Sequence, residues 1–315
     1  MKTDKNNSIT HTQYWSYSNF EKKRYSTNFS LRVMNFLKKL INEGFLKKFG
    51  FEIKRKQSSF RIEQRSYTDN AQILSLRNDQ IANFLIKFGS NYGIGFEKQE
   101  LLDNIKRYDQ IFRNETISDL NGGMGFNNGL FLFILFSHFQ PKVVIESGVW
   151  RGFTTYLIDK AISKDSKIYC FDINLTRTEF KSEKATYYER DLSLVDDINF
   201  GSVNFAFFDD HVSIYDRLQL CLQNKIEIVV VDDDVSLTQV HSDGWPPIPT
   251  ASMVFNYDKI PKKFDWTTNG ISANADISGL KVDDICEFYR YISFPKLAEY
   301  TGYHDYSVTS LLLKR

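Results

Sequence analysis

From residue 142 onward the chain alternates between short apolar runs and helical segments. The runs are rich in β-branched and aromatic residues, and the first five span 142–146, 167–172, 185–189, 203–209 and 226–232. Near-continuous apolar strands separated by helices, here 154–163 and 214–222, are typical of a parallel sheet covered on both faces. The alternation therefore predicts an α/β fold, with segments 288–292 and 306–315 as further strands of the sheet.

The residues before this region predict helices and an N-terminal extension. Apolar residues recur at helical spacing in three segments: 29–49, 67–115 and 129–139. We expect a helical N-terminal extension over 1–66 that carries the amphipathic helix 29–49. A main α/β domain is expected over 67–315, with its core in 118–315.

Charge is distributed unevenly along the chain, although the net charge is only +1. Residues 1–66 hold 15 Lys and Arg against 5 Asp and Glu, whereas the remaining residues hold 25 against 34. The basic helix fits peripheral contact with the inner face of an anionic membrane, or packing of its apolar face on the catalytic body. Because the catalytic body is acidic, we expect no nucleic-acid partner.

Cysteine usage and hydropathy indicate a cytoplasmic protein. The three cysteines, Cys170, Cys221 and Cys286, are odd in number and far apart, which argues against a disulfide framework or a zinc site. The N-terminus is polar and has no signal-peptide core. The longest apolar run, 129–136, is too short to cross a membrane as a helix.

An acidic residue ends or follows each of the first five predicted strands. In an open parallel sheet, ligands bind beyond the carboxyl ends of the strands. The five residues expected at this edge are Glu146, Asp172, Asp191, Asp209 and Asp232. Five carboxyl groups at one edge of a sheet indicate that the functional site lies there.

The first strand-to-helix turn contains Glu146-x-Gly148-x-x-x-Gly152. Glycines in this turn let a cofactor approach the backbone, and Thr154 or Thr155 is a candidate cap for the following helix. Asp172 ends the second strand, where a ribose diol binds in folds of this kind. The dinucleotide spacing G-x-G-x-x-G is absent, which favours S-adenosylmethionine over NAD. The expected cofactor-binding residues are Glu146, Gly148, Gly152, Thr154, Asp172 and Asp191.

Two acidic clusters follow the fourth and fifth strands, at Asp209-Asp210-His211 and Asp232-Asp233-Asp234. Carboxylates crowded at adjacent strand ends repel one another unless a cation neutralises them. Oxygen ligands suit Mg²⁺, with Mn²⁺ or Ca²⁺ as alternatives, and the metal would lower the pKa of an acceptor hydroxyl. Asp209 and His211 are the expected catalytic residues, His211 as a general base. Asp210 and Asp234 are alternatively helix caps.

Two loops flank these motifs, and both are candidates for contact with the acceptor. Residues 121–129 are rich in glycine and asparagine and precede the core. Residues 241–249 hold three prolines and Trp245, whose indole ring offers a stacking face.

These motifs resemble those of class I methyltransferases. Residues 143–155 resemble their motif I, and residues 207–215 resemble a segment of the small-molecule O-methyltransferases grouped with catechol and macrocin O-methyltransferases. The run from Gly122 to His211 is similar to bacterial proteins found with surface-polysaccharide genes. The resemblance covers roughly residues 118–240.

The resemblance implies a Rossmann-like class I fold, with a mainly parallel seven-stranded sheet and helices on both faces. It also implies that Asp209, Asp233 and Asp234 hold the metal, although an alignment that uses Asp232 and Asp233 is equally fair. This sequence departs from the family pattern at Trp150-Arg151, where smaller residues are common. It also has Asp rather than Asn as the third acidic residue.

Three functional hypotheses follow. The first is an O-methyltransferase that uses S-adenosylmethionine, with or without Mg²⁺, to methylate a sugar hydroxyl in a surface polysaccharide or a related small-molecule precursor. The second is a hydroxylase- or hydrolase-like enzyme on the same fold, with iron in place of magnesium. The third is a non-catalytic scaffold of a glycan-synthesis complex. The expected partners are a small-molecule or glycan acceptor and a second copy of the chain.

Overall fold

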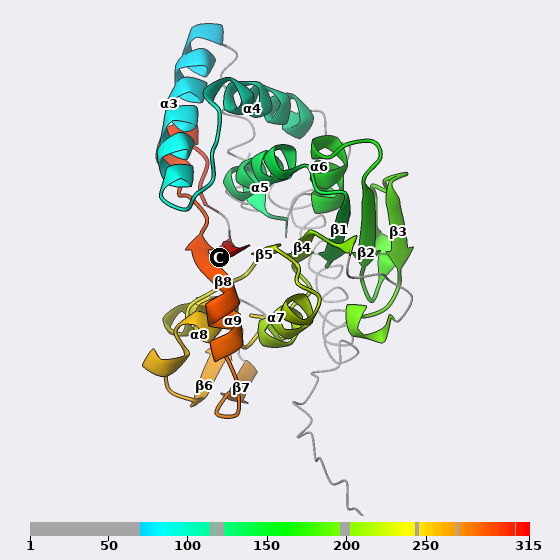
Figure 1. The fold of residues 1–315 in the computed structure, drawn as a ribbon, viewed down its shortest axis with the longest axis vertical. Helices are drawn as coiled ribbons and strands as arrows, with labels where there is room; N and C mark the ends of the chain where they lie inside the picture. The colour runs from blue at the N-terminus through cyan, green and yellow to red at the C-terminus, as the bar shows by residue number, and fades with distance from the viewer. Residues whose placement is uncertain are drawn as a thin grey trace, which may run out of the picture. The chain divides into compact units, whose positions relative to one another are not determined.

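A computed structural model describes residues 70–113, 117, 123–195, 202–242, 246–268, 271–305 and 307–315 (Figure 1). The predicted extension over 1–66, its amphipathic helix and the expected membrane contact lie outside the described residues. Within the described part of the chain, no helix is both long enough and apolar enough to cross a membrane.

A seven-stranded sheet forms the centre of the described domain. Its strands are β1 Val143–Ser147, β2 Lys167–Phe171, β3 Ala185–Tyr188, β4 Phe205–Phe208, β5 Ile228–Val231, β8 Tyr289–Ser293 and β9 Ser310–Lys314. They lie in the order β3-β2-β1-β4-β5-β9-β8. Strands β1 to β5 are parallel, and β9 is antiparallel to both β5 and β8. The predicted mainly parallel, seven-stranded α/β sheet is confirmed.

Burial on both faces explains why the central strands are apolar throughout. In β4, Phe205 and Phe207 pack into one hydrophobic cluster, and Ala206 and Phe208 pack into the other. Successive side chains of a strand point to opposite faces of the sheet, so both faces need apolar residues. Figure 1 shows α5 (Gly125–Phe139) and α6 (Phe153–Ala161) on one side of the sheet and α7 (Ile214–Gln223) on the other.

The helical layer extends outward from α5. Helix α3 (Ala71–Ser90) packs on α4 (Lys98–Arg113), α4 packs on α5, and α5 packs on α6. The sequence predicted one helical region over 67–115, but the chain turns between α3 and α4. Gly93 has a φ of +77°, a left-handed conformation that ends a helix and is easiest for glycine.

Shorter elements complete the domain. They are the helices α8 Ala251–Phe255, α9 Asp283–Phe288 and α10 Ala298–Thr301, and the 3₁₀ turns η2 Leu175–Arg177, η3 Leu192–Leu194, η5 Leu237–Ser242 and η6 Tyr257–Lys259. Residues of α7, α8 and α9 share the second hydrophobic cluster with β4 and β5, so these helices cover the sheet face opposite α5 and α6.

A separate two-stranded hairpin was not predicted. Strand β6 (Lys263–Thr268) pairs antiparallel with β7 (Ile271–Asp276), and β6 contacts η5. Half-buried Phe264 and Trp266 alternate with exposed Lys263 and Asp265. This alternation, followed in the sequence by Asn269-Gly270, is a strong hairpin signal that could have identified it.

Candidate functional site

The glycine turn, Gly148–Gly152, joins β1 to α6 and requires both of its glycines. Gly148 has a φ of +95°, and a Cβ there would lie 2.2 Å from the carbonyl oxygen of Asp209. Gly152 has a φ of +87°, and a Cβ there would lie 2.5 Å from the carbonyl oxygen of Phe180. Both glycines are therefore needed for the backbone conformation and for close contact with neighbouring backbone.

The start of α6 differs from the predicted capping. Gly152 is the N-cap residue and makes no side-chain hydrogen bond to the helix. Thr154 is buried in the first turn, and the Thr155 hydroxyl donates to Glu146 at 2.7 Å rather than capping the helix. The first amides of α6 therefore have no side-chain cap, and they lie directly after the glycine turn.

Asp172 fixes the glycine turn from the end of β2. Its Oδ2 atom accepts hydrogen bonds from the amides of Val149 and Trp150, both at 2.9 Å. Its Oδ1 atom accepts from the amide of Asn174 at 2.9 Å. A carboxylate can accept roughly four hydrogen bonds, so these contacts leave Oδ1 able to accept one more.

Glu146 lies beneath the turn and is fully buried. Its Oε2 atom accepts from the Thr155 hydroxyl and from the Cys170 thiol at 3.3 Å, whereas its Oε1 atom has no hydrogen-bond partner. Burial raises the pKa of Glu146 to about 8, because a charged carboxylate is poorly solvated there. At neutral pH this side chain is therefore mainly a neutral carboxylic acid within the core.

Asp191 belongs to a buried ionic network that the sequence did not predict. Arg217 of α7 donates to Asp191 from Nη2 at 2.6 Å and to Asp210 from Nε at 2.9 Å. Asp210 also accepts from the Ser147 hydroxyl at 2.6 Å. Burial opposes ionisation of Asp191, but hydrogen bonds from Arg217 hold the pKa of this carboxyl below its usual value. The network ties the ends of β1, β3 and β4 to α7.

The ends of β4 and β5 bring together three side chains that we call the cation cluster: Asp209, His211 and Asp233. Each offers one ligand atom, and these atoms all lie within 4.8 Å of one another. The Nδ1 atom of His211 is 3.6 Å from an oxygen of Asp233. The end of β1 adjoins this cluster, because the amide of Asp209 donates to the carbonyl of Ser147, the last residue of β1, at 2.8 Å.

Asp234 lies apart from the cation cluster, contrary to its predicted place among the metal ligands. It is 1% exposed and accepts from the amide of Ser252 at 2.7 Å, from the Tyr291 hydroxyl at 2.8 Å and from the Ser310 hydroxyl. Through these hydrogen bonds, the carboxylate of Asp234 connects α8 to the neighbouring strands. Its contact with the amide of Ser252 is like that of a helix cap, the alternative role predicted for Asp234, although Thr250 is the N-cap residue of α8.

Asp232, from the alternative alignment, is not a member of the cation cluster and is held by other partners. It accepts from the hydroxyls of Ser307 at 2.7 Å and Thr309 at 2.5 Å. Asn128 of α5 donates in turn to both of these hydroxyls, at 2.9 and 2.8 Å. Paired asparagines at the start of an otherwise apolar helix were the sequence signal for this contact; Asn127 likewise donates to the carbonyl of Tyr303 at 2.8 Å.

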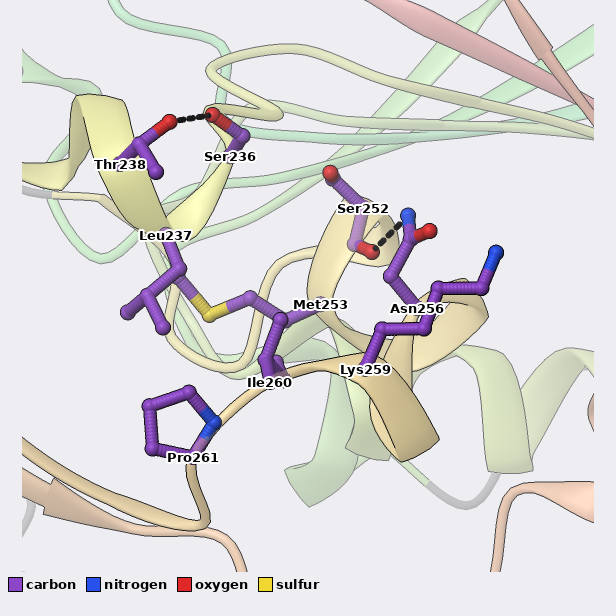
Figure 2. A pocket seen from close by; sticks show the side chains of 9 residues that line it. All are labelled: Ser236, Leu237, Thr238, Ser252, Met253, Asn256, Lys259, Ile260 and Pro261. Atoms are coloured by element: carbon purple, nitrogen blue, oxygen red, sulfur yellow. Dashed lines mark hydrogen bonds between the residues drawn. The ribbon is translucent and has the colours of Figure 1, made fainter.

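A small cavity of about 290 Å³ opens next to the segment that follows β5. Figure 2 shows hydroxyl and amide groups along part of its wall and apolar side chains along the rest. Its lining residues are Ser236, Leu237, Thr238, Ser252, Met253, Asn256, Lys259, Ile260 and Pro261. They flank the loop 241–249 that was predicted to contact the acceptor, while Trp245 lies outside the described residues.

Comparisons with known proteins give only distant similarities. No protein-family model matches the sequence, and no curated protein matches it. The fold is similar to the SAH-bound methyltransferase PaMTH1 of Podospora anserina, at 10% identity and a TM-score of 0.38, over 76% of this chain and 97% of that one.

It is also similar to the O-methyltransferase TomG of Streptomyces achromogenes, involved in tomaymycin synthesis and solved in complex with SAM. That match has 12% identity and a TM-score of 0.34, over 76% of this chain and 98% of that one. A third similar structure is an O-methyltransferase of Bacillus cereus in complex with SAH, at 11% identity and a TM-score of 0.34, over 73% of this chain and 97% of that one. Similarities this distant assign no activity to the chain.

Proposed function

We propose that this protein is an S-adenosylmethionine-dependent O-methyltransferase whose acceptor is a sugar or a related small molecule with a free hydroxyl group. One observation carries the proposal: the glycine turn and the cation cluster are in direct contact. Gly148 lies against the backbone of Asp209, whose amide is hydrogen-bonded to Ser147. A cofactor on the turn and an acceptor at the cluster would therefore be neighbours, as group transfer requires.

The residues around the turn fit a nucleoside cofactor. Asp172 can accept one hydroxyl hydrogen at Oδ1 while its other contacts hold the turn in shape. The uncapped amides at the start of α6 can donate to polar groups of the cofactor. Asp191 supports this region indirectly, because Arg217 holds it to α7. The cofactor supplies a methyl group bonded to a positively charged sulfur.

The cation cluster fits the acceptor end of the reaction. Asp209 and Asp233 would hold a divalent cation, and a hydroxyl bound beside it would lose its proton more readily. The acceptor oxygen would form the new bond to the methyl carbon as the carbon–sulfur bond breaks, and the sulfur would keep the electron pair. The hydroxyl proton would leave to a base or to solvent.

The cavity after β5 would hold the rest of the acceptor. Ser252 lines the cavity, and its amide is hydrogen-bonded to Asp234, the residue next to Asp233. The mixed wall suits a ring that has both hydroxyl groups and an apolar face. Its volume of about 290 Å³ fits an acceptor of roughly monosaccharide size, or one end of a longer glycan.

Calorimetry on the purified protein tests the cofactor part of the proposal. We expect binding of S-adenosylmethionine and of S-adenosylhomocysteine, and no binding of NAD⁺. Asp172→Asn should weaken binding about tenfold or more, because it removes a charged acceptor at the turn. Asp165→Asn, an exposed position in the loop after α6, is the matched control and should bind as the wild type does. A folded protein that binds neither adenosyl compound would refute the proposal.

A further inference from the structure

We infer that His211 is a ligand of the cation site rather than a general base, and that the site therefore prefers a transition cation such as Mn²⁺ or Zn²⁺ to Mg²⁺ or Ca²⁺. The inference deepens the proposed function, because it assumes that a cation binds at the ends of β4 and β5.

The positions of the three side chains fit a common ion. Ligand atoms bound about 2.1 Å from one metal lie roughly 3 to 3.4 Å apart when they are neighbours in its coordination shell. His211 Nδ1 and the Asp233 oxygen are 3.6 Å apart, close to that spacing. The third ligand atom, from Asp209, lies within 4.8 Å of both. Small rotations of these side chains would bring all three onto one ion.

The neighbouring carboxylates Asp210, Asp232 and Asp234 are each held by other protein groups and are not members of the cation cluster. Among the described residues, the third side chain whose ligand atom lies near those of Asp209 and Asp233 is therefore the imidazole of His211. Asp210 is held by the Ser147 hydroxyl and by Arg217. Asp232 accepts from two hydroxyls of the segment before β9. Asp234 is almost fully buried and is held by three donors. Recruiting any of them would leave buried donors without partners, which is unfavourable.

The resulting donor set is one nitrogen and two carboxylates, with solvent access at His211, whose side chain is 46% exposed. Mg²⁺ and Ca²⁺ favour sites made only of oxygen ligands, whereas imidazole suits first-row transition cations and zinc. Open positions on such a cation would remain for water or for an acceptor hydroxyl. A ligating His211 would have its Nδ1 lone pair engaged, so the acceptor proton would leave to another base or to solvent.

Cation titration of metal-free protein, without S-adenosylmethionine, tests the inference directly. Calorimetry with MnCl₂, ZnCl₂, MgCl₂ and CaCl₂ should show Mn²⁺ and Zn²⁺ binding at least about tenfold more tightly than Mg²⁺, the ratio expected from one nitrogen ligand. The Mn²⁺ electron paramagnetic resonance signal provides an independent measure of bound ion.

Two variants of His211, compared with a variant of another histidine, test whether His211 itself binds the cation. His211→Ala should weaken Mn²⁺ and Zn²⁺ binding about tenfold or more, and His211→Asp should narrow the difference between Mn²⁺ and Mg²⁺ by supplying an oxygen ligand. The matched control is His241→Ala, because His241 is an exposed histidine at the end of η5. This variant should change neither the affinity for Mn²⁺ and Zn²⁺ nor the difference between Mn²⁺ and Mg²⁺.

Three outcomes would overturn the inference: equal affinity for Mn²⁺ and Mg²⁺, unchanged Mn²⁺ and Zn²⁺ affinity in His211→Ala, or no cation binding to folded protein. Because these titrations contain no adenosyl compound, they are independent of the calorimetric test of the proposed function. Tight, His211-dependent Mn²⁺ binding in a protein that does not bind S-adenosylmethionine would support this inference while refuting the methyltransferase proposal.

Discussion

The two halves of the sheet edge use their acidic residues differently. At the ends of β1, β2 and β3, each carboxyl group is engaged by the protein: Glu146 is a neutral buried acid, and Asp191 binds Arg217. Asp172 binds the amides of the glycine turn and keeps room at Oδ1 for one further hydrogen bond. At the ends of β4 and β5, Asp209 and Asp233 converge with His211 on one point. An acid that ends a parallel strand is therefore as readily a structural group as a ligand-binding one.

The largest loss of stability is expected from a substitution at Gly148, where the two halves of the sheet edge are in contact. Gly148→Ala should prevent stable folding, because its Cβ would overlap the carbonyl of Asp209 and its backbone would be strained at a φ of +95°. We expect the free energy of unfolding to fall by about 5 kcal/mol or more, measured by chemical denaturation. Gly279→Ala is the control, since a Cβ there meets nothing within 4 Å. Equal stability of the two variants would show that the halves are not in the close contact described.

The second prediction concerns the network that joins the halves. Arg217→Met keeps much of the side-chain volume but leaves two carboxylates without their buried counter-charge. Breaking such a pair costs about 3–5 kcal/mol. Denaturation should show this loss, and adding Asp191→Asn and Asp210→Asn to the variant should recover part of it. A stability within about 0.5 kcal/mol of the wild type would mean that Arg217 contributes no net stabilisation.

The smallest change in stability should come from a substitution of Glu146, and its size should depend on pH. Its folded-state pKa of about 8 lies above the ordinary value of 4.5, so the folded protein holds this proton more tightly than the unfolded chain does. The stability contributed by the proton is fully present below pH 4.5 and is lost as the pH rises toward and through 8. Glu146→Gln should therefore gain stability relative to the wild type between pH 5 and pH 7, by roughly 2–3 kcal/mol.

Denaturation midpoints of both proteins across that pH range measure this difference. The control is Glu179→Gln, at a partly exposed position that is paired with Arg151. Parallel stability curves for the wild type and Glu146→Gln would show that the buried carboxyl does not titrate in this range. The half of the edge formed by β1, β2 and β3 would then carry one more negative charge than a neutral Glu146 gives it.

The sequence predicted the sheet well because apolar strands buried on both faces give a strong signal. Boundaries of β1, β2 and β5 differ from the predicted segments by only a few residues. The roles of single carboxylates were harder to predict. Asp232, Asp233 and Asp234 are adjacent in the sequence, yet only Asp233 joins the cation cluster, and its φ of +53° is a local feature that composition does not reveal.

Partners distant in the sequence decided the remaining roles. Asp232 is held by residues more than 70 positions later. Asp191 is held by Arg217 of α7, and no pattern in that helix indicates a buried cation. His211 was predicted to lie at the site. Whether it accepts a proton or binds a cation can be judged only with its distance to Asp233, which the sequence does not contain. Spacing along the chain cannot supply these pairings, because they depend on how separate elements pack.

The placement of β9 has a consequence for how the protein is made. This strand is synthesised after β8 but lies between β5 and β8 in the finished sheet. Until residues 310–314 have left the ribosome, the apolar strand β5 has an unpaired edge, which is a hazard for association with other chains. Asp232 also lacks its two hydroxyl donors until then. Translation that stalls shortly before β9 should therefore yield an aggregation-prone chain in which the end of β5 is not yet organised.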